Sequence, residues 1–439
     1  MAVKVSRIFH AGYVFESKGV QIAFDPIFEN PFSRNCYAYP ALEFDYDSIR
    51  ALSLAAVFIS HHHDDHCSLD SLKLLNRNTP IYMFCVHPEM FDWIRQLGFK
   101  NVHALKLGGS VQVGPFALKS LPALDVDVDS IFQVNVHGLK ILNVVDSWVD
   151  EETMNQLIQE KPWDLVMWPF QTMRELEVIE PLRVEPSDRR IPQEWLEQLR
   201  FLAPKNLIPS SCQFRMEEWS WYNQAFFPIS YQLFSEQVGP VLPQTHIVRL
   251  NPGSSLKLEG SEMKAAEPLP WIRVIGNQDV DYHYDPALVP PSTAAIAKHF
   301  PELPKEQMAR VISYCQNDLP VKYKDVGPSA DIYFNKARFW QLSVFDFDGT
   351  ETVFHFKLTD DEMISVDTCP QPTEWKTEVI ATKLYSALTT GESLTSLYLR
   401  VEKTVDVDVV EDPLIRCLFN LEFGTYQKAQ LDRILIQGN

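Results

Sequence analysis

The sequence lacks the features that mark membrane, secreted and nucleic-acid-binding proteins. No stretch of it reaches the roughly 18 apolar residues that a membrane-spanning helix needs. Its first residues lack the basic-then-apolar layout of a signal peptide, which predicts a cytoplasmic protein. Acidic residues outnumber basic ones by 58 to 39, and a net charge of -19 without a basic patch disfavours phosphate backbones and anionic headgroups. We therefore expect a small-molecule substrate, and neither nucleic acid nor a membrane as partner.

Cysteine is also scarce. The seven cysteines are scattered, odd in number and free of CxxC pairs, which argues against a disulfide framework and against a zinc finger. Most are expected to be buried apolar side chains. Hydrophobic residues make up 46% of the chain and charged residues 22%, so it can bury sizeable cores. At about 100 to 200 residues per domain, the length predicts more than one domain.

Strand-like and helix-like patterns alternate over the first 250 residues. Residues 10–16 and 20–28 predict a hairpin around Lys18-Gly19, and residues 54–60 a buried strand that ends at a run of histidines. The expected elements after this strand are helices over 68–78, 87–99 and 193–203, a helix capped by Asp150, strands over 80–86, 164–170 and 206–212, and hairpins turning at 114–115 and 137–138. This mixed α/β (α+β) order suits two sheets with helices on their outer faces.

A proline-rich stretch predicts a domain boundary. Prolines gather between residues 286 and 304, which places one domain at 1–260, a linker at 261–305 and a smaller α+β C-terminal domain of unknown role at 306–439. Strands are expected in this last domain over residues 330–335, 340–349, 351–358 and 396–403.

The clearest chemical signal follows the strand at 54–60. His61, His63, Asp65 and His66 form the pattern HxHxDH. Alternate residues of an extended loop point the same way, so His61 and His63 can bind one metal ion while Asp65 and His66 face a second. The alternative is a solvated polar loop, but such a cluster behind a buried strand is costly without metal. We expect one or two divalent ions, zinc or iron.

Together with residues 10–26, where Asp25 closes a strand, and ILNVVDS at 141–147, this motif resembles the metallo-β-lactamase superfamily. The resemblance implies a metallo-β-lactamase-type αββα sandwich. It also implies an aspartate that bridges two metals, and Asp146 matches that position. Asp65 and Asp146 would then be the catalytic carboxylates that hold and orient the attacking hydroxide.

Two further ligand positions depart from the superfamily pattern. Where a third histidine is expected the chain reads LPALDVDVDS, and Asp125 is the closest match, with Asp127 a register away. A turn or capping role is the alternative for Asp125. Where the last histidine is expected, only Ser210, Ser211 and Cys212 are present. A set of His61, His63 and Asp125 suits non-haem iron better than the all-nitrogen set typical of zinc.

Three segments also resemble the CMP-N-acetylneuraminate hydroxylase family, which lacks the last histidine too: HHHDDHCSLDSLKLL, DSIFQVNVHGLKILNVVDS and EDPLIRCLFN. That family carries a Rieske domain, which needs CxH followed by CxxH. The chain has Cys85-x-His87 but no CxxH. We therefore expect no electron-feeding domain, and an oxygenase of this kind would need a separate electron donor.

Weaker candidates could contact substrate. His10 opens the first hairpin and could support a ligand or touch substrate, although a satisfied core histidine is the simpler interpretation. Trp168, Gln171 and Arg174 follow a buried strand, where packing and salt bridging explain them about as well. For the aromatic patch after residue 212, a core or interface role is favoured over substrate stacking; its members are Trp219, Trp221 and Tyr222.

The sequence favours a metal-dependent hydrolase, in which a metal-bound hydroxide attacks an ester, amide, lactone or phosphoester. The alternative is a non-haem iron oxygenase that uses the same ligands. A degenerate binding protein is a third interpretation, against which the intact HxHxDH argues.

Overall fold

The computed structural model describes residues 2–170, 173–211, 214–329, 331–359, 361–370, 373–419 and 425–437. Within these ranges the chain separates into two compact units. The first unit is drawn from Met1–Met173, Ser187–Asp285 and Gln430–Asn439, and the second from Arg174–Pro186 and Pro286–Ala429. None of the helices in the described ranges combines the length and apolar character needed to cross a bilayer.

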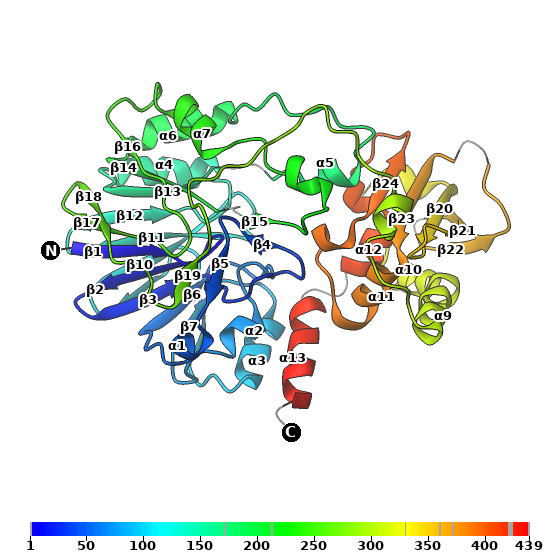
Figure 1. The fold of residues 1–439 in the computed structure, drawn as a ribbon, viewed down its shortest axis with the longest axis horizontal. Helices are drawn as coiled ribbons and strands as arrows, with labels where there is room; N and C mark the ends of the chain where they lie inside the picture. The colour runs from blue at the N-terminus through cyan, green and yellow to red at the C-terminus, as the bar shows by residue number, and fades with distance from the viewer. Residues whose placement is uncertain are drawn as a thin grey trace. The chain divides into compact units, whose positions relative to one another are not determined.

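An eight-stranded sheet forms one layer of the first unit, in the order β18-β17-β1-β2-β3-β6-β7-β8 (Figure 1). The pairs from β3 to β8 are parallel, and the other pairs are antiparallel. The strands are β1 Ala2–Arg7, β2 Tyr13–Ser17, β3 Val20–Phe24, β6 Ala56–Ile59, β7 Ile81–Met83, β8 Val102–Ala104, β17 Ser255–Glu259 and β18 Glu262–Ala266.

A seven-stranded sheet forms the second layer, in the order β16-β14-β13-β12-β11-β10-β9. The pairs from β12 to β16 are parallel, and the hairpins of β9 to β12 are antiparallel. The strands are β9 Ser110–Val113, β10 Phe116–Pro122, β11 Ser130–Val136, β12 Leu139–Asn143, β13 Leu165–Pro169, β14 Asn206–Ser210 and β16 His246–Ile247.

The core between the two sheets is aromatic and aliphatic. Strands alternate their side chains, so Phe58 of β6 and Phe132 of β11 both point inward, and Phe24 contacts Phe132 with ring centroids 5.2 Å apart. Burying one such side chain contributes about 1.5–3 kcal/mol. This packing fixes the two sheets against each other and so sets the positions of the loops at their ends.

Helices cover the outer faces. On the second sheet, α4 (Glu151–Gln159), α6 (Gln193–Leu202) and α7 (Tyr231–Val238) share a second core with the outward side chains. On the first sheet lie α1 (Tyr46–Arg50), α2 (Leu69–Leu72) and α3 (Pro88–Gln96) (Figure 1). Asp150 caps α4 as expected, accepting the Thr153 N–H at 3.0 Å. The expected αββα sandwich is confirmed.

Two expected elements differ in the structure. The helix expected over 68–78 ends at Leu72, because the Arg77 guanidinium donates to the carbonyls of Leu72, Lys73 and Leu75 and so satisfies them without further helical turns. The strand expected over 330–335 is wrong: Ile332–Asn335 form a 3-10 turn, which Asp331 caps by accepting the N–H of Tyr333 at 2.7 Å.

The first unit extends beyond residue 260. β18 completes a hairpin with β17, and β19 (Ile272–Val274) pairs with β5 (Leu42–Phe44), so two strands of the first unit lie in the expected linker, and the unit continues to Asp285. Conversely α5 (Glu175–Ile179) belongs to the second unit, where the next residue, Glu180, accepts an ion pair from Lys403 at 2.6 Å.

The second unit is built on a five-stranded sheet in the order β22-β21-β20-β23-β24. Its core joins this sheet to the unit's helices through buried side chains such as Trp340 and Trp375. The strands are β20 Arg338–Phe345, β21 Glu351–Leu358, β22 Met363–Val366, β23 Trp375–Ile380 and β24 Arg400–Lys403. The helices are α8 Thr293–Ala297, α9 Lys305–Ser313, α10 Leu319–Val326, α11 Ala381–Thr390 and α12 Pro413–Phe419.

The end of α13 (Thr425–Gln437) returns to the first unit at α2. Gln430 accepts the Leu69 N–H at 2.8 Å and donates to Ser68 Oγ at 3.2 Å, while Arg433 pairs with Asp70. The first N–H groups of a helix have no partner within the helix, so Gln430 supplies one. Because α2 begins three residues after His66, this contact braces the chain just beyond the HxHxDH motif.

Candidate metal centre

The topology gathers histidines and aspartates at one edge of the sandwich. The loop after β1 carries His10, the loop after β3 carries Asp25, and the loop after β6 carries the HxHxDH motif. On the second sheet, Asp129 precedes β11 and Asp146 follows β12. β3 and β6 are parallel neighbours, and β1 with β2 and β11 with β12 are antiparallel hairpin pairs, so these loops open at the same edge.

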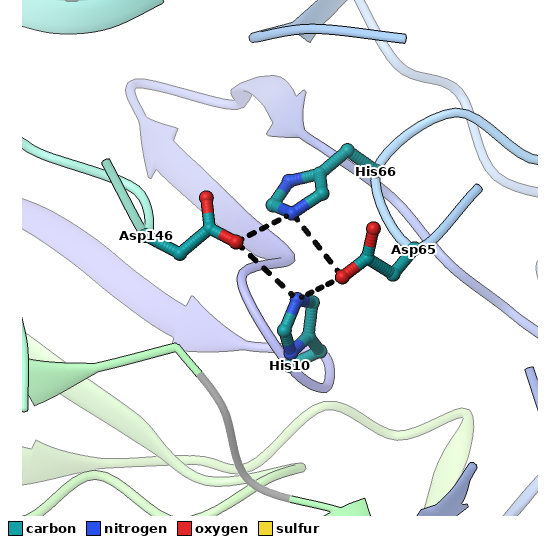
Figure 2. Close-up of side chains that lie close together, drawn as sticks. All are labelled: His10, Asp65, His66 and Asp146. Atoms are coloured by element: carbon teal, nitrogen blue, oxygen red, sulfur yellow. Dashed lines mark hydrogen bonds and ion pairs between the residues drawn. The ribbon is translucent and has the colours of Figure 1, made fainter. Parts of the chain in front are cut away.

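Four side chains form a compact group, here called cluster A: His10, Asp65, His66 and Asp146 (Figure 2). One donor atom of each lies within 4.8 Å of all the others. His66 Nε2 is 3.0 Å from Asp146 Oδ2 and 3.5 Å from Asp65 Oδ2, and His10 Nε2 is 2.9 Å from Asp65 Oδ2. Two imidazole nitrogens and two carboxylate oxygens form a donor set that divalent metals accept.

A second group, cluster B, contains His61, His63 and Asp129. His61 Nε2 lies 3.0 Å from His63 Nδ1 and 3.7 Å from Asp129 Oδ1. Asp129 Oδ1 is buried and accepts no hydrogen bond from the described residues. Burial, followed by the charge of Asp146, raises the pKa of Asp129 to about 6. Cluster B thus places two imidazoles and one partly buried carboxylate together.

Asp125 does not take the place expected of it. Its side chain is exposed and accepts the N–H of Asp127 at 3.2 Å, while its carbonyl accepts the N–H of Asp129 at 2.8 Å. These bonds close a turn, and the turn brings Asp129 rather than Asp125 to the histidines. Asp125 has the turn role that was its alternative, and Asp127 is exposed as well.

Asp25 supports a histidine of each cluster, His66 directly and His61 through Ser60. It is fully buried, accepts Ser60 N and Ser60 Oγ, both at 2.7 Å, and lies 3.1 Å from His66 Nδ1. Ser60 Oγ is in turn 2.9 Å from His61 Nδ1. A carboxylate on Nδ1 fixes the tautomer of a histidine and leaves Nε2 as the donor face. For His66 that face is the one directed at Asp146.

The electrostatics of cluster A favour a cation. Burial is the largest single effect and raises the pKa of both Asp65 and Asp146, but the charges and hydrogen bonds of His66 and His10 together outweigh it and hold both pKa values below the usual range. Burial lowers the pKa of His66, but the charges of Asp146 and Asp65 and the hydrogen bonds with Asp146 and Asp25 together outweigh it and raise that pKa. The carboxylates therefore stay ionised in a buried site, which is the state in which they bind metal.

Part of the backbone strain lies at this edge. Four of the eleven non-glycine residues with left-handed backbones in the described ranges are found here, with φ of 47° at His10, 39° at Asp25, 63° at Val145 and 64° at Ser211. Such a φ is unfavourable above all for a β-branched residue, so Val145 is held by its surroundings. Strain of this kind gathers at functional sites, where packing determines the conformation.

The structure places the other candidates elsewhere. Trp168 is fully buried in the core on the outer face of the second sheet, with its ring centroid 6.1 Å from that of Trp195. Arg174 belongs to the second unit and donates to the Glu185 carbonyl at 2.7 Å. Tyr222 is buried in the first unit, as a core role predicts. Gln171 and Cys212 lie outside the described residues.

Sequence reasoning missed the nearness of Asp129 to His61 and that of His10 to Asp65 and Asp146. The three aspartates of LDVDVD have equal spacing, so the sequence alone does not say which one the turn brings inward. His10 precedes the HxHxDH motif by about fifty residues. The one available signal was its place at the end of a strand beside the strand that Asp25 closes.

Comparison with protein families bears on this site. Residues 4–181 match the model of the β-lactamase superfamily domain. This part of the chain is therefore similar to that domain. The matched range contains every residue of clusters A and B. The finer resemblance to the CMP-N-acetylneuraminate hydroxylase family stays a prediction.

Two curated proteins are similar to the chain over part of their length. A UPF0173 metal-dependent hydrolase of Ignicoccus hospitalis is 31% identical over 115 residues, which is 26% of this chain and 44% of that protein. A UPF0173 metal-dependent hydrolase of Koribacter versatilis is 29% identical over 124 residues, which is 28% of this chain and 47% of that protein. The chain therefore spans less than half the length of each relative.

Solved structures also resemble part of the chain. Igni18, a metallo hydrolase of Ignicoccus hospitalis, has a TM-score of 0.41 and 19% identity over 59% of this chain and 99% of its own. CmlA, a diiron β-hydroxylase of Streptomyces venezuelae, has a TM-score of 0.40 and 15% identity over 60% of this chain and 54% of its own. At such scores neither likeness bears on activity.

Proposed function

We propose that the chain is a metal-dependent hydrolase that acts on an ester, amide, lactone or phosphoester. The observation that carries the proposal is the meeting of cluster A and cluster B at one edge of a metallo-β-lactamase-type sandwich. The names of the two curated relatives, metal-dependent hydrolases, support it.

The residues present fit divalent metal. His61, His63 and Asp129 would hold one ion, and cluster A would hold a second, with Asp146 facing both groups: its charge acts on Asp129, and its Oδ2 lies 3.0 Å from His66 Nε2. The buried, unbonded Oδ1 of Asp129 is an acceptor in need of a partner. Bound metal would supply a Lewis acid and would lower the pKa of a nearby water.

The protein's own groups would prepare the reaction. Asp65 and Asp146, which are 24% and 21% exposed, are the ionised acceptors that can hold and orient an attacking water. Asp25 and Ser60 keep His66 and His61 in fixed rotamers, so the donors do not have to reorganise during turnover.

One observation favours a second candidate, a non-haem iron oxygenase. Cluster B combines two histidines with one carboxylate, the set that suits iron with open positions. This function would need a separate electron donor, since the sequence contains no Rieske motif.

The two functions are separated by a metal-removal experiment. The protein is stripped with a chelator, reloaded with zinc or iron, and assayed on p-nitrophenyl acetate, bis(p-nitrophenyl) phosphate and a γ-lactone. We expect removal of the metal to lower the rate on at least one substrate by about 10³-fold or more, and zinc to restore it. Asp127→Ala, at an exposed position of the nearby turn, is the matched control and should behave as the parent.

Equal rates before and after stripping would contradict the proposed hydrolase. Oxygen consumption that depends on iron and on an added reductant, without hydrolysis of any substrate, would favour the oxygenase instead.

A further inference from the structure

We infer that His10 is the fourth metal ligand of cluster A, so that the β1–β2 loop of the first sheet supplies the imidazole that the end of β14 lacks. The inference rests on the proposed function, in which cluster A binds a divalent metal. It assigns the role of the last histidine to a residue at the opposite end of the chain's first domain.

The described residues at the end of β14 make structural contacts to the first sheet. Ser210 is fully buried, and its hydroxyl shares a hydrogen bond of 2.7 Å with the Tyr13 hydroxyl. The carbonyl of Ser211 accepts from the Arg7 guanidinium at 3.2 Å. These contacts join β14 to β1 and β2, so this corner of the second sheet ties the two sheets together.

His10 has the position that a ligand needs. Its ring is 1% exposed, and its Nε2 lies 2.9 Å from Asp65 Oδ2 and 4.0 Å from Asp146 Oδ2 (Figure 2). Neither ring nitrogen makes a hydrogen bond of good geometry to a described residue. A buried imidazole that faces two carboxylates and makes no hydrogen bond of good geometry is suited to bind a cation through its ring nitrogen.

The walls around the ring are apolar. The His10 ring centroid lies 5.4 Å from that of Phe32 and 6.0 Å from that of Phe214, which begins β15 (Phe214–Arg215). Such walls exclude water from one side of the imidazole and strengthen the interaction of its lone pair with a cation.

Hydrogen bonds to the backbone hold His10 in this position beside the carboxylates. The Arg7 guanidinium donates to the His10 carbonyl from Nη2 at 2.8 Å and from Nε at 3.2 Å, and it fixes the left-handed backbone at φ 47°. The next turn needs Gly12, since a Cβ there would meet the Asp25 carbonyl oxygen at 2.8 Å and that of Phe9 at 3.0 Å. A loop held this tightly, and strained at the residue that faces the carboxylates, has the preorganisation of a ligand-bearing loop.

The competing explanation is that His10 is an imidazolium paired with Asp65 for stability. The two roles differ in what His10→Gln does. Glutamine keeps a neutral donor for Asp65 but is a poor ligand for zinc, so a structural role predicts unchanged metal binding in this variant.

The test compares metal content in the parent, His10→Ala, His10→Gln and His10→Gly, with His63→Ala as the matched cluster B variant. Each protein is stripped, titrated with zinc and analysed for bound metal after dialysis. The parent should bind about two ions per chain. We expect each His10 variant to keep one ion and to bind the other about tenfold to hundredfold more weakly or worse. Added imidazole should restore the second ion in His10→Gly, because it fills the vacated ligand position.

Unchanged stoichiometry and affinity in the His10 variants would overturn the inference while leaving the proposed function intact. A parent that binds no metal would overturn both. A measurement on the parent guards against unfolded variants: in the Co(II)-loaded protein, the ring protons of His10 should show large paramagnetic shifts, and a diamagnetic His10 would contradict its role as ligand.

Discussion

Asp146→Ala should strip the protein of most of its metal and lower hydrolysis by about 10³-fold or more, the largest effect expected of a single substitution. In the proposed site Asp146 serves both ions: its Oδ2 lies 3.0 Å from His66 Nε2 in cluster A, and its charge acts on Asp129 in cluster B, where it contributes to the raised pKa. Removing it deletes a donor of cluster A and weakens the electrostatic field that holds the cation of cluster B. Elemental analysis after dialysis and the hydrolysis assay measure the two effects.

Two controls make this result specific. Asp127→Ala removes an exposed aspartate near the same edge and should change neither metal content nor rate. A melting curve in the absence of metal shows whether Asp146→Ala is folded, as we expect, because the carboxylate is not part of a core. Full retention of both ions by a folded Asp146→Ala protein would show that the clusters do not share this residue.

The second large effect concerns Asp129, which the structure places where Asp125 had been expected. Asp129→Ala should lose the ion of cluster B, because it removes the carboxylate that lies 3.7 Å from His61 and leaves two histidines. Asp129→His should restore a three-donor set with nitrogen only and shift the preference from iron toward zinc. Metal analysis of proteins grown with iron and zinc supplied equally measures both changes.

Asp125→Ala is the matched control for this pair, since it lies in the same turn but is exposed. It should keep the parent's metal content and identity and cost about 0.5 kcal/mol or less. The reverse pattern, with metal lost in Asp125→Ala and kept in Asp129→Ala, would show that the turn closes differently around the metal.

Much of the architecture could be predicted because the hydrophobic patterns of single segments agree with the strands and helices of the fold. The run of apolar residues at 54–60 forms β6, and the HxHxDH motif directly follows it, so the strand's end and the motif together locate the site. Asp146 follows β12 in the same manner. Such positions depend on strand ends, which hydrophobic patterns indicate well.

The remaining positions depend on tertiary contacts that local patterns do not contain. The inward turn of Asp129 depends on hydrogen bonds within one loop, and the place of His10 depends on Arg7, which reaches carbonyls more than 200 residues away. The short α2 likewise ends because Arg77 folds back on its carbonyls, and Gln430 supports its first turn. Each of these three features depends on a hydrogen bond whose partner cannot be identified from the neighbouring sequence.

Anomalous diffraction from crystals grown with zinc tests the central claim most directly, since it locates metal without relying on any variant or substrate. The account predicts two peaks in the first unit, one within about 2.0–2.2 Å of donor atoms from His61, His63 and Asp129 and one at the same distance from those of cluster A. A map without a peak at this edge of the sandwich, or with metal bound only elsewhere on the chain, would contradict it.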